Sequence, residues 1–397
     1  MSAAPPPANW PGWRGPNRDA LVPVLPARLA DKPTVVWRAI LTDKGIGGIA
    51  ATSKVVLVSD RELGDQFDVF RCLDAATGRE LWAHRYPAPG LLDYGNSPRA
   101  TPLIDGDQCF TLGAHGHLSC LELATGRPLW QLDVKSEFGL VEELKWGLCG
   151  SPLVVDRKLI LYAGGPQAAI VAFDPATGKP LWKTPGNPPG YGSLMVGTLG
   201  GKRQLVGHDA STLGGWDIAT GKRLWTLEPP IAGDFNVPTP LVWQDQLIVA
   251  TENNGTRLYR FDDRGVIAAK PDAEYQALSP DTHSPVIVGD RLFGILNGLH
   301  CLDLKNGLKP LWIGKDPGFL EHASLIGAPD RSLVITGEAE LILLDATANE
   351  MKILGRQKAL DGESGLLAHP ALVGSRLYLR GSSEIVCLEL DPAAKKD

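Results

Sequence analysis

The stretches Asp74-Ala-Ala-Thr-Gly-Arg-Glu-Leu-Trp82, Glu122-Leu-Ala-Thr-Gly-Arg-Pro-Leu-Trp130, Asp174-Pro-Ala-Thr-Gly-Lys-Pro-Leu-Trp182 and Asp217-Ile-Ala-Thr-Gly-Lys-Arg-Leu-Trp225 repeat one pattern. A fifth copy, Asp303-Leu-Lys-Asn-Gly-Leu-Lys-Pro-Leu-Trp312, contains one extra residue. A pattern that returns about every 45 residues indicates a series of similar structural units rather than one irregular core.

Each copy of the pattern predicts a β-hairpin. The acidic or Thr side chain can accept hydrogen bonds from nearby backbone amides, and glycine tolerates the positive φ of a tight turn. Apolar, alternating residues precede the turn, for example at 169–173, and a second strand begins near the Trp. Two further short strands are expected upstream, for example at 151–155 and 158–162. Four antiparallel strands per unit are typical of a propeller blade.

The tryptophan spacing predicts the number of blades. Trp37, Trp82, Trp130, Trp182 and Trp225 follow one another at intervals of 43 to 52 residues. The next interval, to Trp312, is 87 residues, which indicates two units with one Trp lost near Ala269. Two more units follow before residue 390. The sequence therefore predicts an all-β, eight-bladed propeller of four-stranded antiparallel blades, with seven blades as the alternative.

The two ends of the repeat region complement each other. Residues 35–40 form an outer strand that no inner strands precede, and the last unit, which ends at 384–389, has three strands and lacks a fourth. We expect the N-terminal strand to close the ring inside the C-terminal blade. Because eight units use nearly all 397 residues, the predicted boundaries are an extension at 1–33, the propeller at 34–390 and a tail at 391–397.

Charge and composition narrow the class of protein. The net charge is −6 and no basic run extends beyond Lys395-Lys396, which argues against nucleic-acid binding. No apolar stretch is long enough to span a membrane. Residues 1–9 lack the apolar core of a signal peptide, which is typical of a cytoplasmic protein or of an exported chain whose leader was removed.

Four of the six cysteines occupy one equivalent position. The cysteines that each precede a Leu-Asp or Leu-Glu step are Cys72, Cys120, Cys301 and Cys387, and in other units Ala172 and Gly215 hold that place. The remaining two cysteines, Cys109 and Cys149, lie outside this position. The position therefore requires a small apolar side chain. Equivalent positions on different blades are too far apart for a disulfide, so we expect these thiols to be free.

The span Ala172-Phe-Asp-Pro-Ala-Thr-Gly-Lys-Pro-Leu-Trp182 resembles the tryptophan-docking repeat of pyrroloquinoline-quinone-type propellers. In that family the Trp packs its indole between neighbouring blades. The family includes quinoprotein alcohol dehydrogenases, the propeller lipoprotein of the outer-membrane barrel-assembly machinery and a group of exported bacterial propellers. The N-terminal Trp10-Pro-Gly-Trp13-Arg-Gly-Pro16-Asn17 is similar to the start of that last group. The resemblance implies a periplasmic or secreted protein, while the chain's own start leaves a cytoplasmic location open.

This chain departs from the quinoprotein dehydrogenases in its cysteines. Those enzymes carry two adjacent cysteines that form a ring over the cofactor, and often a haem domain. No Cys-Cys pair and no Cys-x-x-Cys-His occurs here, and residues 1–9 hold no lipidated Cys. We therefore expect no cofactor, with pyrroloquinoline quinone and calcium as the alternative that the resemblance implies.

The candidate site is expected where the loops leading into the innermost strands converge around the propeller axis. These loops are rich in polar and aromatic residues, and Trp146 lies outside the repeat register, which favours ligand stacking over a core role. Arg and His side chains suit an anionic or hydroxylated ligand. The candidate ligand-binding residues are Asn96, Arg99, Trp146, Tyr191, Asn236, His283, His322 and His369.

Two classes of function remain open from the sequence. One is a binding scaffold that offers this face to a protein, a glycan or a small molecule. The other is an enzyme on the same face, either a quinone-dependent dehydrogenase or an activity based on His, Arg and carboxylate groups. No metal site is expected, because the histidines show no ligand spacing, and no nucleophile or phosphate-binding motif occurs.

Overall fold

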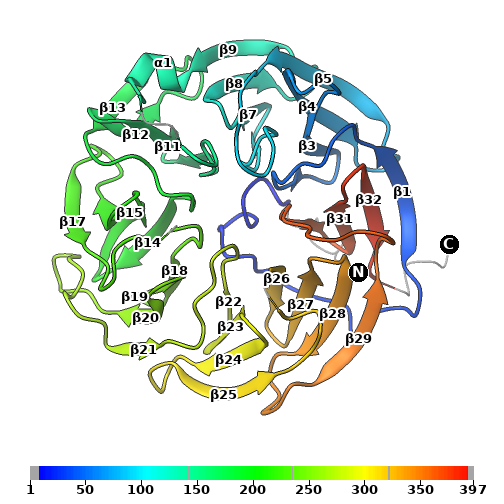
Figure 1. Cartoon of the computed structure of the whole chain (residues 1–397), viewed down its shortest axis with the longest axis vertical. Coiled ribbons are helices and arrows are strands. Elements are labelled where there is room, and N and C mark those ends of the chain that lie inside the picture. The colour runs from blue at the N-terminus through cyan, green and yellow to red at the C-terminus, as the bar shows by residue number, and fades with distance from the viewer. Residues whose placement is uncertain (1–8, 142–143, 235, 321, 392–397) are drawn as a thin grey trace, which may run out of the picture.

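The computed structural model describes residues 9–141, 144–234, 236–320 and 322–391. These residues form eight sheets, each of four antiparallel strands, arranged as the blades of a ring (Figure 1). The prediction of an eight-bladed propeller is therefore confirmed, and the seven-bladed alternative is wrong. Residues 1–8 of the predicted extension and 392–397 of the predicted tail lie outside the described residues.

Blades 1 to 4 follow one another along the first part of the chain. Blade 1 contains β2 (Ala50–Ala51), β3 (Val55–Arg61), β4 (Phe67–Asp74) and β5 (Glu80–Pro87). Blade 2 contains β6 (Leu103–Asp105), β7 (Gln108–Leu112), β8 (His117–Glu122) and β9 (Pro128–Asp133). Blade 3 contains β10 (Leu153–Val155), β11 (Lys158–Gly165), β12 (Ala168–Phe173) and β13 (Pro180–Thr184). Blade 4 contains β14 (Met195–Leu199), β15 (Lys202–His208), β16 (Leu213–Trp216) and β17 (Arg223–Leu227).

Blades 5 to 8 complete the ring. Blade 5 contains β18 (Leu241–Trp243), β19 (Gln246–Thr251), β20 (Gly255–Tyr259) and β21 (Ala273–Tyr275). Blade 6 contains β22 (Val286–Val288), β23 (Arg291–Ile295), β24 (Leu299–Asp303) and β25 (Lys309–Gly314). Blade 7 contains β26 (Ala323–Ala328), β27 (Arg331–Thr336), β28 (Glu340–Asp345) and β29 (Ile353–Lys358). Blade 8 contains β30 (Ala371–Val373), β31 (Arg376–Arg380) and β32 (Glu384–Glu389), with β1 (Thr34–Ile40) as its outer strand.

The N-terminal strand closes the ring as the sequence predicts. β1 pairs antiparallel with β32, with Thr34 opposite Glu389 and Ile40 opposite Glu384. Because β1 covers the outer edge of β32, the ring has no unpaired seam at blade 8. The first strand of each blade is innermost, and the first strands of several neighbouring blades, such as β2 and β30, contact each other around the axis.

A single-turn helix, α1 (Val134–Phe138), connects blades 2 and 3. The side chain of Asp133 caps its N-terminus by accepting from the backbone amides of Lys135 and Ser136, and Gly139 ends it in a left-handed conformation. No helix in the part of the chain that the structure describes is long and apolar enough to cross a membrane.

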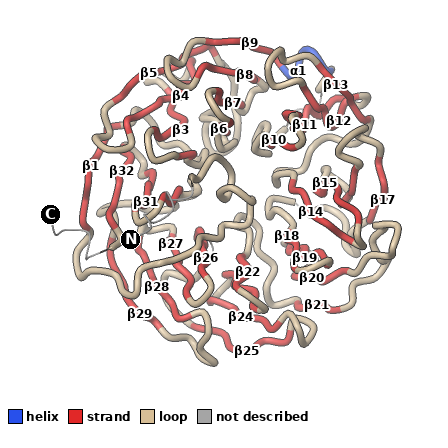
Figure 2. The backbone as a smooth tube through the Cα atoms, turned by 180° about the vertical axis from the view of Figure 1, so that it is seen from behind, coloured by secondary structure: helices blue, strands red, loops and turns tan. Residues whose placement is uncertain are grey.

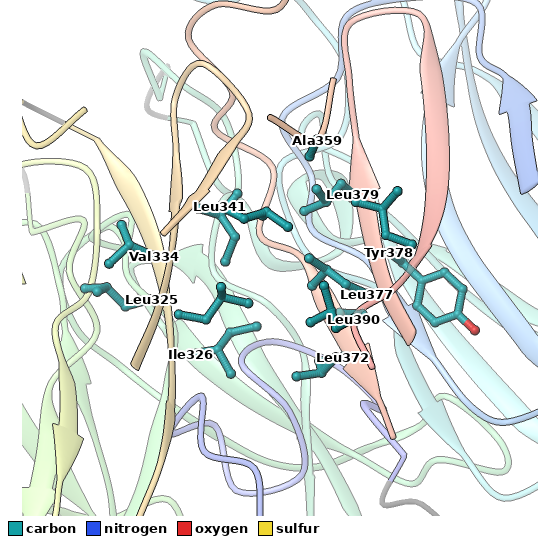
Figure 3. Packing of buried hydrophobic residues seen from close by; sticks show 14 of the residues in the cluster. Leu325, Ile326, Val334, Leu341, Ala359, Leu372, Leu377, Tyr378, Leu379 and Leu390 are labelled. Atoms are coloured by element: carbon teal, nitrogen blue, oxygen red, sulfur yellow. The ribbon is translucent and has the colours of Figure 1, made fainter. Parts of the chain in front are cut away.

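Apolar side chains fill the space between neighbouring blades. Figure 3 shows this packing where Ile326 and Leu341 of blade 7 lie beside Leu377 and Leu379 of blade 8. Similar clusters lie between blades 2 and 3, 3 and 4, 4 and 5, and 5 and 6. Burial of each such side chain stabilises the fold by roughly 1.5–3 kcal/mol, so the blades form one rigid support for the loops.

The repeated tryptophans join each blade to the next. The indole N–H of Trp82 donates to the carbonyl of Leu123 at 2.8 Å, and that of Trp130 donates to the carbonyl of Pro175 at 2.8 Å. Equivalent bonds of Trp37, Trp182 and Trp312 reach Ala75, Ile218 and Ala348. Each acceptor belongs to the hairpin turn of the following blade.

The Thr-Gly step of the repeat is explained by the same contact. Gly126 has a φ of 72°, and a Cβ atom built on it would lie 2.5 Å from the indole of Trp82. Only glycine combines the left-handed backbone with room for the ring. The Trp of one unit and the Gly of the next therefore form a single structural requirement, which is why the two recur together.

Blade 5 is the unit that lacks the tryptophan. The register of β20 and β21 places Ala273 opposite Leu258, the position that Trp182 holds opposite Ala172 in blade 3. The sequence estimate of Ala269 is therefore four residues too early, because the loop between these strands is longer and contains its own bridge between Phe261 and Ile267.

Blade 4 meets the altered turn of blade 5 through a glutamine. The indole N–H of Trp225 donates to the Gln204 side-chain oxygen at 2.6 Å, and the Gln204 amide donates to the carbonyl of Gly265 at 3.0 Å. The Trp225 ring also packs edge-on against Phe261. Gln204 therefore replaces the direct bond that the other tryptophans make.

The prediction for the four equivalent cysteines is confirmed. Each is buried and lies opposite a repeat tryptophan on the outer strand, as in the pairs Cys72 with Trp82 and Cys387 with Trp37. All six cysteines, including Cys109 in β7, are free thiols. Burial raises the pKa of the Cys72 thiol to about 12, so it remains protonated and unreactive at neutral pH.

Replacing Trp182 by Ala is expected to lower the free energy of unfolding by about 3–5 kcal/mol, because the change removes the hydrogen bond to Ile218 and leaves a cavity between two blades. Trp146→Ala is the matched control, since this ring lies among loops rather than between blades. Urea denaturation of both variants checks the ranking, and a larger loss for Trp146→Ala would contradict it.

Candidate functional site

The antiparallel order of the strands places two sets of loops on one side of the ring, here named the upper face. These are the loops that lead into each innermost strand and the loops that join the second and third strands of each blade. The hairpin turns that contain Thr-Gly lie on the opposite side, the lower face. All eight candidate residues belong to upper-face loops or to the starts of strands there.

Residues 9–33 start in the centre of the ring and then run outward past blade 7 (Figures 1 and 2), where the carbonyl of Ala30 accepts from the Gln357 side chain of β29 at 2.8 Å. The backbone of Trp10 exchanges hydrogen bonds of 2.8 and 2.7 Å with Ala51 of β2, and the backbone on either side of Leu21 bonds to Gly327 of β26. The Arg18 guanidinium donates to the carbonyl of Pro152 at 2.9 Å, just before β10. The chain's own N-terminal segment therefore fills the axial channel and ties together blades on different sides of the ring.

Three of the candidate residues gather at the axis and are here named the axial histidines: His283, His322 and His369. They precede β22, β26 and β30 in consecutive blades. The rings of His283 and His322 lie 6.4 Å apart between centroids. The ring of His369 lies 4.9 Å from Trp13 and 6.2 Å from Trp10. The three histidines converge as expected, and the N-terminal segment contacts His369 through Trp10 and Trp13.

All three axial histidines are neutral at pH 7. Burial, followed by the neighbouring His322 and Arg14, lowers the pKa of His283 to about 3. Burial lowers the pKa of His322 to about 4 against the opposing carboxylate of Asp281. Burial and then the positive charge of Arg14 lower the pKa of His369 to about 3. These imidazoles can therefore donate or accept hydrogen bonds but add no charge to the axis.

Arg99 and Asn96 shape the loop between blades 1 and 2. The Arg99 guanidinium donates to the backbone carbonyls of Asp93 and Gly95, both at 2.6 Å. The Asn96 side-chain oxygen accepts from the amide of Leu92 at 2.9 Å. Both side chains are buried. Their bonds hold their own loop, and ligand contact for either residue remains a proposal.

Asn236 has a similar supporting position between blades 4 and 5. Its backbone is left-handed, with a φ of 53°, and its side-chain amide donates to the carbonyl of Asp209 at 3.1 Å. Its own carbonyl accepts from the amides of Tyr191 and Gly192 at 3.2 and 2.7 Å. Asn236 therefore fixes the loop that carries Tyr191.

Trp146 and Tyr191 meet on the upper face. Their ring centroids lie 4.6 Å apart, and Tyr94 approaches Trp146 edge-on at 6.4 Å. The Trp146 indole N–H donates to the carboxylate of Asp93 at 3.4 Å, and the Lys145 ammonium lies 5.4 Å from the ring. Since Tyr94 is 66% exposed, this aromatic group is available to a partner.

A pocket of about 210 Å³ lies beside the aromatic group, among the loop from blade 1 to blade 2, the turn between β7 and β8, and the connection from blade 2 to blade 3. Its lining is mixed, with leucine side chains beside polar groups, and consists of Pro89, Gly90, Leu91, Leu92, Ala114, His115, Lys135, Leu140, Leu144, Gly147 and Leu148. Leu91 at the pocket is 88% exposed, and Val141, next to Leu140 in the chain, is 87% exposed. Two large apolar side chains are therefore exposed on these loops.

A buried ion pair supports this pocket from below. The Arg61 guanidinium bonds to the carboxylate of Asp68 at 2.6 Å, with both side chains fully buried. Arg61 also donates to the carbonyl of Ala88 at 2.9 Å, at the start of the loop that carries Leu91. Because the loop is held at its base, the pocket is preformed rather than assembled on binding.

The sequence analysis did not predict the role of Arg14, Leu91 or Val141. Leu91 and Val141 are ordinary apolar residues in polar loops, and their exposure depends on loop geometry. Arg14 belongs to the Trp10–Asn17 stretch, which lies outside every blade. An aromatic segment with a central Arg at this place was the signal that could have indicated a buried position at the axis.

The described residues include no group of three or more His, Cys, Asp or Glu side chains placed to hold a metal ion. The axis, where three histidines converge, is filled by Trp10, Trp13 and Arg14 rather than by carboxylates. These residues do not fit calcium with a quinone at the axis.

The model of the family described as outer membrane protein assembly factor BamB matches residues 28–185 and 166–312, which together make up more than half of the chain. The chain belongs to this BamB family. The BamB of Burkholderia pseudomallei is 27% identical over 251 residues, which cover 61% of this chain and 62% of that protein. The BamB of Shewanella oneidensis is 21% identical over 348 residues, which cover 74% of this chain and 84% of that protein.

The fold is shared beyond the BamB family. A europium-containing methanol dehydrogenase matches with a TM-score of 0.66 at 12% identity, covering 96% of this chain and 98% of that one. At this identity the likeness concerns the fold alone. The sequence match to the Burkholderia BamB covers less than two thirds of that protein's length. Family membership alone therefore assigns neither an activity nor a partner to this chain.

Proposed function

We propose that this protein is a non-enzymatic scaffold of the cell envelope that binds another protein on its upper face, over blades 1 to 3. The observation that carries the proposal is the pocket of mixed lining with the apolar side chain of Leu91 exposed at it. Membership of the BamB family, whose members are described as outer membrane protein assembly factors, supports a periplasmic location and a role in that assembly.

The pocket suits a bulky apolar side chain of the partner. Its leucine lining offers apolar area, and the adjacent rings of Tyr94 and Trp146 offer flat surface that loses little entropy on binding. Lys135 lines the pocket, and Lys145, which pairs with Asp93 at 3.3 Å, lies nearby. A partner segment with apolar anchors and an acidic group beside them matches this chemistry.

The test replaces Leu91 and Val141 together by Asp in the organism that encodes the protein. We expect the amount of folded outer-membrane protein, measured by heat-modifiable gel mobility, to fall. Deletion of the gene should lower this amount in the same way. Both side chains are almost fully exposed, so the variant should fold normally. Circular dichroism of the purified variant checks this.

Leu181→Asp is the matched control. Leu181 is 52% exposed at the start of β13, beside the hairpin turn of the lower face. This variant should retain normal outer-membrane protein levels. Equal loss in both variants, or no effect of deleting the gene, would contradict the proposed upper-face scaffold.

The enzymatic alternative is tested separately by adding pyrroloquinoline quinone and calcium to the purified protein. Because the axis is filled by residues 9–33, we expect no stoichiometric quinone absorbance to remain with the protein after gel filtration. Retained quinone together with dye reduction by an alcohol would favour the dehydrogenase reading over the scaffold.

A further inference from the structure

Arg14 is a buried guanidinium whose hydrogen-bonding capacity is only partly used. Its side chain is 1% exposed. Nη2 donates to the carbonyls of Pro285 at 2.6 Å and Asp19 at 3.2 Å. Nε and Nη1 are buried and have no hydrogen-bond partner within the described residues. A buried charged donor without an acceptor destabilises the folded state.

The side chains around Arg14 share the same deficit. The indole N–H groups of Trp10 and Trp13 are buried and lack acceptors in the described part of the structure. The rings of both tryptophans contact His369, and the positive charge of Arg14 lowers the pKa of His369. The unused donors therefore lie in one region at the axis.

The axial histidines add two further donors. The backbone amide of Ile295 donates to Nε2 of His283 at 3.0 Å, so the proton of this neutral ring is on Nδ1, which has no partner among the described residues. Both ring nitrogens of His322 are likewise without a partner there, and a neutral imidazole always carries one N–H.

The buried arginines of the N-terminal segment bond to backbone carbonyls rather than to carboxylates. Arg18, the second buried arginine of the segment, also donates to backbone carbonyls, those of Pro152 and Ser151. Burial lowers the pKa of Arg14 to about 10 and of Arg18 to about 9, so both stay protonated at pH 7. Asp19 is the carboxylate whose charge acts on Arg14, and Asp281 acts on His322. In the described residues, no carboxylate forms a salt bridge with either arginine.

We propose that this axial cluster binds a small free oxyanion, of the phosphate, sulfate or carboxylate class. Arg14 supplies the positive charge, and Trp13, His283 and His322 direct N–H donors at the oxygen atoms. An oxyanion accepts several hydrogen bonds at once and offsets the unpaired charge, which a water molecule or a cation does not. Trp13, His322 and His369 are half-buried, and the unpartnered nitrogens of Trp13 and His322 are fully buried. An oxyanion therefore has to enter past these rings. The site is independent of the protein-docking pocket.

The first test measures the thermal stability of the exhaustively dialysed full chain against rising phosphate, sulfate or acetate, with sodium chloride at matched ionic strength as the reference. A ligand that binds only the folded state raises Tm in proportion to the logarithm of its concentration above Kd. We expect this rise with at least one oxyanion, and a stoichiometry of one by calorimetry. A Tm that follows chloride in every titration overturns the proposal and leaves water as the occupant.

Variants then assign the binding to the cluster. Arg14→Met keeps the length of the side chain and should abolish the oxyanion effect on Tm. Trp13→Phe keeps a ring but removes one N–H, and should weaken binding several-fold. Trp130→Phe removes an indole N–H outside the site and should leave the oxyanion Kd unchanged. If Trp13→Phe binds as tightly as Trp130→Phe, the anion lies elsewhere and the assignment is wrong, whether or not Arg14→Met folds.

Discussion

Deletion of residues 1–41 is expected to leave the protein insoluble or largely unfolded. The deletion removes β1, so the whole outer edge of β32 loses its hydrogen-bonding partner. It also removes Trp37, whose indole joins blade 8 to blade 1 through the carbonyl of Ala75. An open ring exposes both a bare strand edge and the apolar surface between two blades, which favours aggregation.

Deletion of residues 1–33 is the matched control for this experiment. It removes the axial segment, including the buried Trp10, Leu25 and Leu29, but keeps β1. We expect a soluble protein with reduced stability. The soluble fraction after expression and the Tm of each form measure the difference. If the two deletions behave alike, ring closure by β1 is not the stabilising contact.

Acidification from pH 7 to pH 5 is expected to destabilise the protein by several kcal/mol. Burial lowers the pKa values of His283, His322 and His369 to about 3, 4 and 3 in the folded state. In the unfolded chain a histidine has a pKa of about 6.5. Between these values the unfolded chain binds more protons than the native protein, so stability falls as pH decreases below about 6.5.

The size of the effect follows from the number of such groups. Each buried histidine contributes up to about 1.4 kcal/mol per pH unit in this window, and His115 and His208, whose pKa values are also lowered to about 4, add to the axial three. Asp68 opposes them, because burial raises its pKa to about 6 and acid then favours its native form. Burial also raises the pKa values of Asp19 and Glu252. These three carboxylates do not cancel the histidines, because burial lowers the pKa of all eight.

Urea denaturation at pH 7.5, 6.5 and 5.5 measures this dependence directly. The slope of unfolding free energy against pH gives the difference in bound protons. His369→Phe should reduce that difference by close to one proton at pH 5.5. A stability that is flat from pH 7.5 to 5.5 would mean that the axial histidines are accessible to protons in the folded protein.

The fold could be predicted from sequence because each repeat carries its own physical requirement. The Thr-Gly turn and the Trp are complementary parts of one contact between blades, so Trp82 and Gly126 mark the architecture even at moderate repeat similarity. The prediction was less accurate in blade 5. There the tryptophan position, occupied by Ala273, follows a longer loop whose length no periodicity constrains.

The candidate site was predictable only in part. His283, His322 and His369 precede innermost strands, so a ring of blades brings them together regardless of loop detail. Arg99 occupies an equivalent position but bends back onto the carbonyls of its own loop. The axial cation is instead Arg14, from a segment with no repeat pattern. Its place in the channel depends on packing that local sequence does not encode.

The pairing of β1 with β32 also has a mechanical consequence. The two strands are antiparallel, and Thr34 lies opposite Glu389. Once residues 9–33 have been pulled free, force from the two chain ends therefore enters this pair at adjacent points. Tension then loads one pair of hydrogen bonds at a time and opens the ladder like a zipper, whereas shear would load all of them together. Blade 8 is therefore the place where a pull on both termini would first break the ring.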